Sequence, residues 1–138
     1  MSKIALIIGG TGGLGAASAE DLARDHSVII AGRNKDKGDA IVNRITSAGG
    51  KAAFLTVDIL DPASVTSLHT KVLQQYGRID LALNAAGVLP PFQKLADSNK
   101  EEFDRCMAIN VTGTYLAMLE QIRAMRRNPD NSGGHIVN

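Results

Sequence analysis

Residues 4–15 read IALIIGGTGGLG, an aliphatic run followed directly by a glycine-rich turn. The run is typical of a strand buried on both faces of a parallel sheet. Glycine allows a sharp turn and a close approach of backbone to a pyrophosphate, which the start of the next helix stabilises. The turn matches two glycine patterns of dinucleotide-binding proteins, Gly10-x-Gly12-x-x-Gly15 and Gly9-x-x-x-Gly13-x-Gly15. The stretch predicts a phosphate-binding strand–turn–helix unit, with a purely structural turn as the alternative.

The rest of the chain continues this alternation of apolar strands and amphipathic helices. Asn34 predicts a helix start, Asp61-Pro62 predicts another, and Ser98 with Glu101 forms a capping box. Further strands are expected over 27–31, 52–57, 79–83 and 135–138, and helices over 14–25, 35–48, 61–76 and 98–127. The prediction is an α/β fold, a Rossmann-type doubly wound parallel sheet truncated after the fifth strand.

Length and composition limit the classes of function. A chain of 138 residues forms one domain, and a formal net charge of +1 argues against nucleic-acid binding. Cys106 is the single cysteine, so a disulfide scaffold is excluded, and the three histidines lie too far apart for a local metal motif. The apolar start is too short for a signal peptide or a membrane span, so we expect a cytoplasmic protein without membrane contact.

Arg33 stands where the second strand should meet the adenosine ribose of a bound dinucleotide. An acidic residue there accepts hydrogen bonds from the ribose 2′-hydroxyl, whereas arginine pairs with a 2′-phosphate. The sequence therefore favours NADP over NAD. An ordinary exposed loop arginine is the alternative.

Taken together, the motifs resemble the first part of a short-chain dehydrogenase/reductase. The resemblance rests on the glycine loop, Asp58, Asn84-Ala85-Ala86-Gly87, Asn110 and the final segment 134–138, in that order over essentially the whole chain. Two departures are Ile8, where the family usually has threonine, and Ala85, where it has a second asparagine. The family implies a fold of the Rossmann type and hydride transfer between a nicotinamide and a carbonyl or alcohol, without a metal.

The resemblance also assigns roles to residues. Asp58 would contact the adenine ring, although a turn residue is the alternative, and Asn84 would border the cofactor while satisfying loop backbone. Asn110 resembles the asparagine of the family's catalytic tetrad, which lies in a kinked helix whose free backbone groups hold a water molecule. Without the family resemblance, the side chain of Asn110 is expected to form an interhelical hydrogen bond. The expected cofactor-binding residues are Gly9, Thr11, Gly12, Gly13, Leu14, Gly15, Arg33, Asn34, Asp58, Ile59, Asn84, Ala85, Ala86 and Gly87.

The family's proton donor is a tyrosine in Tyr-x-x-x-Lys, assisted by a serine, and neither tyrosine here fits. Tyr76 is followed four positions later by Asp80, and Tyr115 by Leu119. Residues 1–138 are thus expected to form a single dinucleotide-binding domain without the C-terminal catalytic segment, and to be inactive alone. Cys106 lacks a nearby histidine base and is expected to be a small buried residue.

Three hypotheses follow. The first is the N-terminal part of an NADP-dependent oxidoreductase acting on a small carbonyl or alcohol substrate. The second is a non-catalytic NADP(H)-binding module or subunit, and the third, weaker one is another doubly wound domain such as a methyltransferase. By resemblance, helix 98–127 contributes to a homo-oligomer interface, and we expect its Leu116, Met118 and Leu119 to lie exposed and the isolated chain to associate.

Overall fold

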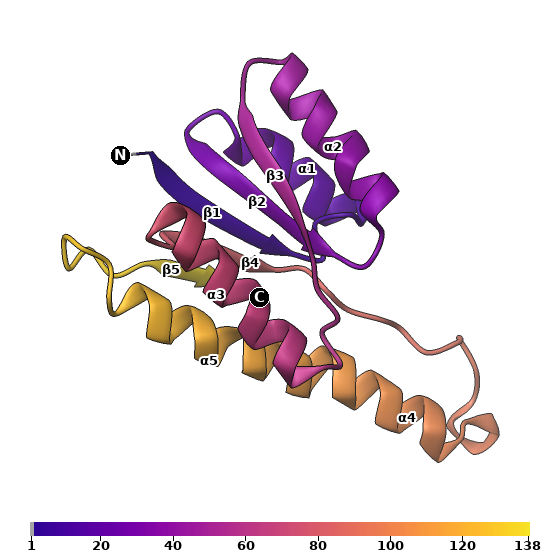
Figure 1. The fold of residues 1–138 in the computed structure, drawn as a ribbon. Coiled ribbons are helices and arrows are strands. Elements are labelled where there is room, and N and C mark those ends of the chain that lie inside the picture. Colours follow the sequence, from indigo (N-terminus) through magenta and orange to yellow (C-terminus); the bar gives the residue numbers. More distant parts are fainter. Residues whose placement is uncertain (1) are drawn as a thin grey trace.

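A computed structural model describes residues 2–138 as a five-stranded parallel sheet with helices on both faces (Figure 1). The strands are β1 (Lys3–Ile8), β2 (His26–Gly32), β3 (Lys51–Thr56), β4 (Leu81–Asn84) and β5 (His135–Val137). The helices are α1 (Gly13–Leu22), α2 (Lys35–Ser47), α3 (Pro62–Tyr76), α4 (Lys100–Met107) and α5 (Thr114–Met125), with a 3-10 turn η1 (Leu95–Asp97) and a π-helical segment η2 (Ala108–Gly113). The predicted Rossmann-type α/β fold is confirmed.

The order of the strands creates a crevice at the centre of the sheet. The order is β3-β2-β1-β4-β5, so the chain moves outward from β1 to β3 and then returns to the other side of β1. In open parallel sheets, ligand sites form at the carboxyl ends of the strands where the connections diverge in this way. The loops after β1 and β4 therefore meet at one edge.

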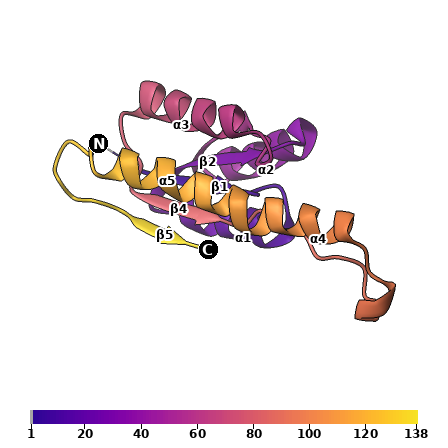
Figure 2. The same cartoon turned by 90° about the horizontal axis from the view of Figure 1, so that it is seen from below.

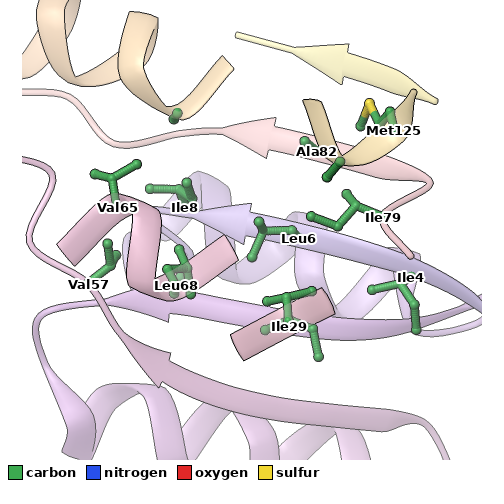
Figure 3. Close-up of a cluster of buried hydrophobic side chains, with 14 residues drawn as sticks. Ile4, Leu6, Ile8, Ile29, Val57, Val65, Leu68, Ile79, Ala82 and Met125 are labelled. Carbon is green, nitrogen blue, oxygen red and sulfur yellow. The ribbon is translucent and has the colours of Figure 1, made fainter. Parts of the chain in front are cut away.

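Two hydrophobic cores hold the helices against the sheet. Ile4, Leu6 and Ile8 of β1 face α3 and α5 (Figure 3). Ala5 and Ile7 face α1 and α2. The first core also contains Ile29, Val57, Val65, Leu68, Val72, Ile79, Ala82, Ala117, Ala124 and Met125. Full burial of an isoleucine or leucine contributes about 1.5–3 kcal/mol, so β1, buried on both faces, is the centre of stability.

The local signals at two helix starts and one helix end are confirmed. The Asn34 side chain accepts a hydrogen bond from the N–H of Lys37 at 3.0 Å, and Asp61 caps α3 through the N–H of Ala63. Gly77 ends α3 with a left-handed φ of 76°, which glycine adopts without a steric penalty. The caps at Asn34 and Asp61 fix where α2 and α3 begin, at the carboxyl ends of the strands.

The capping box predicted at Ser98 is wrong. The Ser98 hydroxyl donates instead to the carbonyl of Leu95 at 2.7 Å and closes the 3-10 turn η1. Asn99 caps α4 by accepting a hydrogen bond from the N–H of Glu102 at 2.9 Å. The helix expected over 98–127 thus begins at Lys100, passes through η2, and ends with α5 at Met125.

The exposed apolar side chains of this long helix are different from those expected. Leu116, Met118 and Leu119 are half-buried and not exposed as expected. Leu116 packs against the first core, and Met118 contacts the Asn138 side chain. Four exposed apolar residues are spaced by four along α4, η2 and α5, namely Phe103, Met107, Val111 and Tyr115, and Ile122 is exposed further along α5. Figure 2 shows α4 and the loop before it extending beyond the end of the sheet. Within residues 2–138, no helix combines the length and the apolar character that crossing a bilayer requires.

Candidate functional site

The glycine turn after β1 is built by close backbone contacts. Gly9 has a φ of 83°, and a Cβ added there would lie 2.4 Å from the amide nitrogen of Ala86. A Cβ on Gly15 would lie 2.4 Å from the carbonyl oxygen of Gly9. The Gly9 N–H donates to the carbonyl of Ala31, which joins the turn to β2. Only glycine at positions 9 and 15 lets the turn pass so close to the next loop and to α1.

A hollow of about 240 Å³ opens beside this turn at the carboxyl ends of β1, β2 and β4. It brings together residues that are far apart in the sequence, as a nucleotide site at the switch point of the sheet requires. The expected cofactor-binding residues that line it are Gly9, Thr11, Gly12, Arg33, Asp58, Ile59, Ala85, Ala86 and Gly87. Gly13, Leu14 and Gly15 form the first turn of α1 next to it, while Asn34 and Asn84 line neighbouring hollows.

Arg33 lies at the β2 end of the hollow, immediately after that strand. Its guanidinium makes no ion pair or hydrogen bond with any side chain in residues 2–138. The surrounding shallow surface is lined by Thr11, Asn34 and Lys37, together with Lys35 and the acidic Asp36. Lys35 is engaged with Asp39 on the same helix. A free guanidinium at this end is suited to pairing with a phosphate group.

Asp58 has a local role as well as a place in the hollow. Its carboxylate accepts a hydrogen bond from the N–H of Leu60 at 3.0 Å, and its own N–H donates to the Ser64 hydroxyl at 2.9 Å. This is the turn geometry that the alternative reading predicted. Asp58 and Ile59 also line the hollow, so this turn fixes their position in its wall.

Asn110 lies in the π-helical segment η2, where the helix pattern is interrupted as expected. Its side chain pairs with the backbone of Val88: the amide donates to the carbonyl at 2.7 Å and its oxygen accepts from the N–H at 2.8 Å. The partner is the loop after β4 rather than another helix, so the interhelical reading is wrong. Asn110 therefore links the long helix to the loop at Gly87 and Val88, which lines the hollow.

A second hollow lies beside the first, at the carboxyl ends of β4 and β5. Its lining consists of Asn84, Ala86, Gly87, Val88, Leu89, Asn110, Thr114 and Asn138. Neither Tyr76 nor Tyr115 lines either hollow. Cys106 is half-buried, and no group of His, Cys, Asp or Glu side chains within residues 2–138 is arranged to hold a metal ion.

Sequence reasoning missed the amide cluster beneath this second hollow. The Gln121 side chain is fully buried and forms two hydrogen bonds with the Asn84 side chain, at 2.7 and 3.0 Å. Asn84 also donates to the Asn138 side chain at 2.8 Å. A signal was present, because Gln121 stands between Ala117 and Ala124 on the apolar face of α5.

Sequence reasoning also missed a charged network at the opposite edge of the sheet. Asp80 accepts hydrogen bonds from the Ile4 N–H at 2.8 Å and from the Arg78 guanidinium, which also reaches Asp130 at 3.1 Å. Burial by itself raises the pKa of Asp80, but the hydrogen bonds from Arg78 and Ile4 hold that pKa below its ordinary value. The network joins β1, β4 and the loop before β5, and its role is structural.

Comparison with known proteins identifies the family. A family profile described as "short chain dehydrogenase" matches residues 3–138. The chain belongs to this family. Its members are oxidoreductases that act on small molecules with a nicotinamide cofactor, and the order of motifs from the glycine turn to β5 follows from that membership.

Two curated relatives illustrate the relationship. A 3beta-hydroxysteroid dehydrogenase of Mediterraneibacter gnavus is 30% identical over 99% of this chain and 48% of its own length. A 2,5-dichloro-2,5-cyclohexadiene-1,4-diol dehydrogenase of Sphingobium indicum is 37% identical over 99% of this chain and 53% of its own length. The chain thus spans about half the length of these relatives.

Solved structures share the fold. A metagenomic short-chain oxidoreductase in complex with NADP has a TM-score of 0.90 at 30% identity, with 99% of this chain and 61% of that chain covered. An actinorhodin polyketide ketoreductase variant with NADPH has a TM-score of 0.90 at 25% identity, with 99% and 52% covered.

Proposed function

We propose that residues 1–138 form the dinucleotide-binding domain of an NADP-dependent oxidoreductase that interconverts a carbonyl and an alcohol. The observation that carries the proposal is the unpaired guanidinium of Arg33 at one end of a hollow that begins at the glycine turn. A 2′-phosphate would find its charge partner there, whereas NAD offers only a hydroxyl group. Two structural relatives, one in complex with NADP and one with NADPH, support the same choice.

Each part of the cofactor has a proposed partner in this chain. The pyrophosphate would contact the backbone of Gly9, Thr11, Gly12 and the start of α1 at Gly13, Leu14 and Gly15, where N–H groups and the helix dipole stabilise an anion. The 2′-phosphate would bind Arg33 beside Asn34, and the adenine would lie against Asp58 and Ile59. The nicotinamide end would extend along Asn84, Ala85, Ala86 and Gly87. When bound, the cofactor supplies the hydride.

The residues beside the nicotinamide end would position the reacting groups. Asn110 is the proposed tetrad member, and its pairing with Val88 keeps the helix and the loop after β4 in a fixed relation. Proton transfer to a carbonyl oxygen needs a donor near the second hollow. Tyr76 and Tyr115 do not line that hollow, so the donor would be a group other than these two.

The cofactor preference is tested with Arg33→Asp. We expect the dissociation constant for NADPH to rise about 10- to 100-fold, because a charge-assisted phosphate contact is replaced by repulsion, while NADH binding is kept or improved. Lys71→Asp, on the exposed face of α3, is the charge-matched control. Fluorescence titration of both cofactors measures the ratio. An unchanged NADPH to NADH ratio in Arg33→Asp would contradict the assignment.

A second candidate function is NADP(H) binding without turnover. This candidate requires no proton donor, and Tyr76 and Tyr115 lie outside both hollows. Oxidation of NADPH in the presence of a panel of ketones and aldehydes separates the two candidates. Turnover by a protein containing this chain supports the oxidoreductase, and saturable NADPH binding without any turnover supports the binding module.

A further inference from the structure

The amide cluster beneath the second hollow is a closed hydrogen-bonding unit. Gln121 on α5 has no exposed surface, and Asn84 at the end of β4 is 8% exposed. The Gln121 amide nitrogen donates to the Asn84 side-chain oxygen, and the Asn84 nitrogen donates back to the Gln121 oxygen. A buried amide pair of this kind has one favourable arrangement, because rotating either amide opposes like groups.

The same cluster sets the orientation of Asn84 toward β5. The Asn84 nitrogen carries two N–H groups, one directed to Gln121 and the other to the Asn138 side chain. Both donors are thus in use, and the Asn84 oxygen is in use as well. Gln121 therefore decides which side of the Asn84 amide faces β5.

Asn84 and Asn138 line the second hollow, whereas Gln121 lies behind them on α5. The loop that follows Asn84 provides Ala86 and Gly87, which line both hollows. The adenosine end is remote from this cluster, because Arg33 follows β2 on the other side of β1. A disturbance at Gln121 should accordingly affect one end of a bound dinucleotide and leave the other intact.

We propose that Gln121 is a positioning residue for the nicotinamide end of the cofactor, acting through the side chain of Asn84. This inference rests on the proposed function. The rival explanation is that Gln121 only stabilises the packing of α5 on β4. The two explanations differ in what they predict for a ligand that contains only the adenosine end.

The test compares NADPH with 2′,5′-ADP, a fragment that carries the adenosine and the 2′-phosphate but no nicotinamide. Gln121→Met keeps the volume of the side chain and removes both hydrogen bonds to Asn84. We expect the dissociation constant for NADPH to rise about three- to tenfold, since buried donors and acceptors are left unpaired, with that for 2′,5′-ADP unchanged. Gln121→Glu keeps one acceptor but places a carboxylate oxygen against the Asn84 oxygen. This variant should also raise the dissociation constant for NADPH and leave that for 2′,5′-ADP unchanged.

Asn128→Met is the matched control. Asn128 is also a buried amide, but it bonds the backbone of Ile79 and Gly133 at the amino ends of β4 and β5. Its replacement should lower the melting temperature without changing the ratio of the two affinities. Isothermal titration calorimetry gives the affinities, and thermal unfolding followed by circular dichroism gives the stability of each variant.

The outcomes separate the explanations. A rise confined to NADPH in both Gln121 variants supports the positioning role. Parallel losses for NADPH and 2′,5′-ADP, an unchanged affinity for both, or the same selective loss in Asn128→Met would overturn it. Failure of the unaltered chain to bind either ligand would instead overturn the proposed function, and this inference with it.

Discussion

Gly15 and Gly13 both belong to the glycine turn, but only Gly13 has room for a side chain. A methyl group on Gly15 would collide with the Gly9 carbonyl, whereas no atom outside the local helix backbone lies within 4 Å of a Cβ on Gly13. We expect Gly15→Ala to lower the free energy of unfolding by about 1–3 kcal/mol. Gly13→Ala should leave it unchanged or raise it by up to about 1 kcal/mol, because alanine favours the helix. Urea unfolding of both variants measures the difference, and equal stabilities would contradict it.

The buried side chain of His69 should make the free energy of unfolding depend on pH. The ring is 2% exposed, its Nδ1 bonds the Val65 carbonyl at 2.8 Å, and its Nε2 has no partner among residues 2–138. Burial lowers the pKa of His69, although the Val65 carbonyl and the charge of Glu120 act in the opposite direction. The unfolded chain then binds a proton at a higher pH than the folded one. The free energy of unfolding should therefore decrease as the pH falls below about 6.5.

The measurement is urea unfolding between about pH 7.5 and 5.5, the range in which an unfolded histidine titrates. His69→Leu should reduce the dependence, and His135→Gln, on an exposed histidine, should keep it. A slope that survives in His69→Leu would show that another group is responsible.

At the scale of elements, the packing of α2 on β3 is especially close at Gly38. A Cβ on Gly38 would lie 2.1 Å from the Phe54 ring. Gly38→Ala should therefore lower the free energy of unfolding by about 1–3 kcal/mol, although alanine is the better helix former. In a Phe54→Leu background the same change should cost less, and a double-mutant cycle by urea unfolding measures that coupling. Additive effects would mean that α2 shifts freely on β3.

The continuous helical segment from α4 to α5 shows how neighbouring elements settle what local sequence leaves open. Ser98 and Asn99 are both good N-cap residues, and the Leu95 carbonyl, which engages the Ser98 hydroxyl, decides between them. The interruption at η2 was expected from Asn110, but its partner Val88 lies 22 positions away.

At the scale of the whole molecule, the exposed row of Phe103, Met107, Val111 and Tyr115 predicts self-association. These side chains are between 42% and 63% exposed and follow one face of the long helix. Contiguous apolar surface of this kind favours contact with another surface. Light scattering should show a concentration-dependent rise in mass, which Met107→Lys with Val111→Glu reduces and Asn43→Glu, on the exposed side of α2, does not. A monomer at high concentration would contradict the prediction.

The sequence by itself determined the fold, the glycine turn and the caps at Asn34 and Asp61, because these depend on periodicity and on hydrogen bonds between near neighbours. Only the tertiary structure decided the partners of Asn84 and Asn110 and the burial of Gln121. Asn84 and Gln121 are separated by 37 positions. No local sequence pattern predicts this hydrogen-bonded pair, because the two amides meet only after α5 has packed on β4 and both side chains are buried.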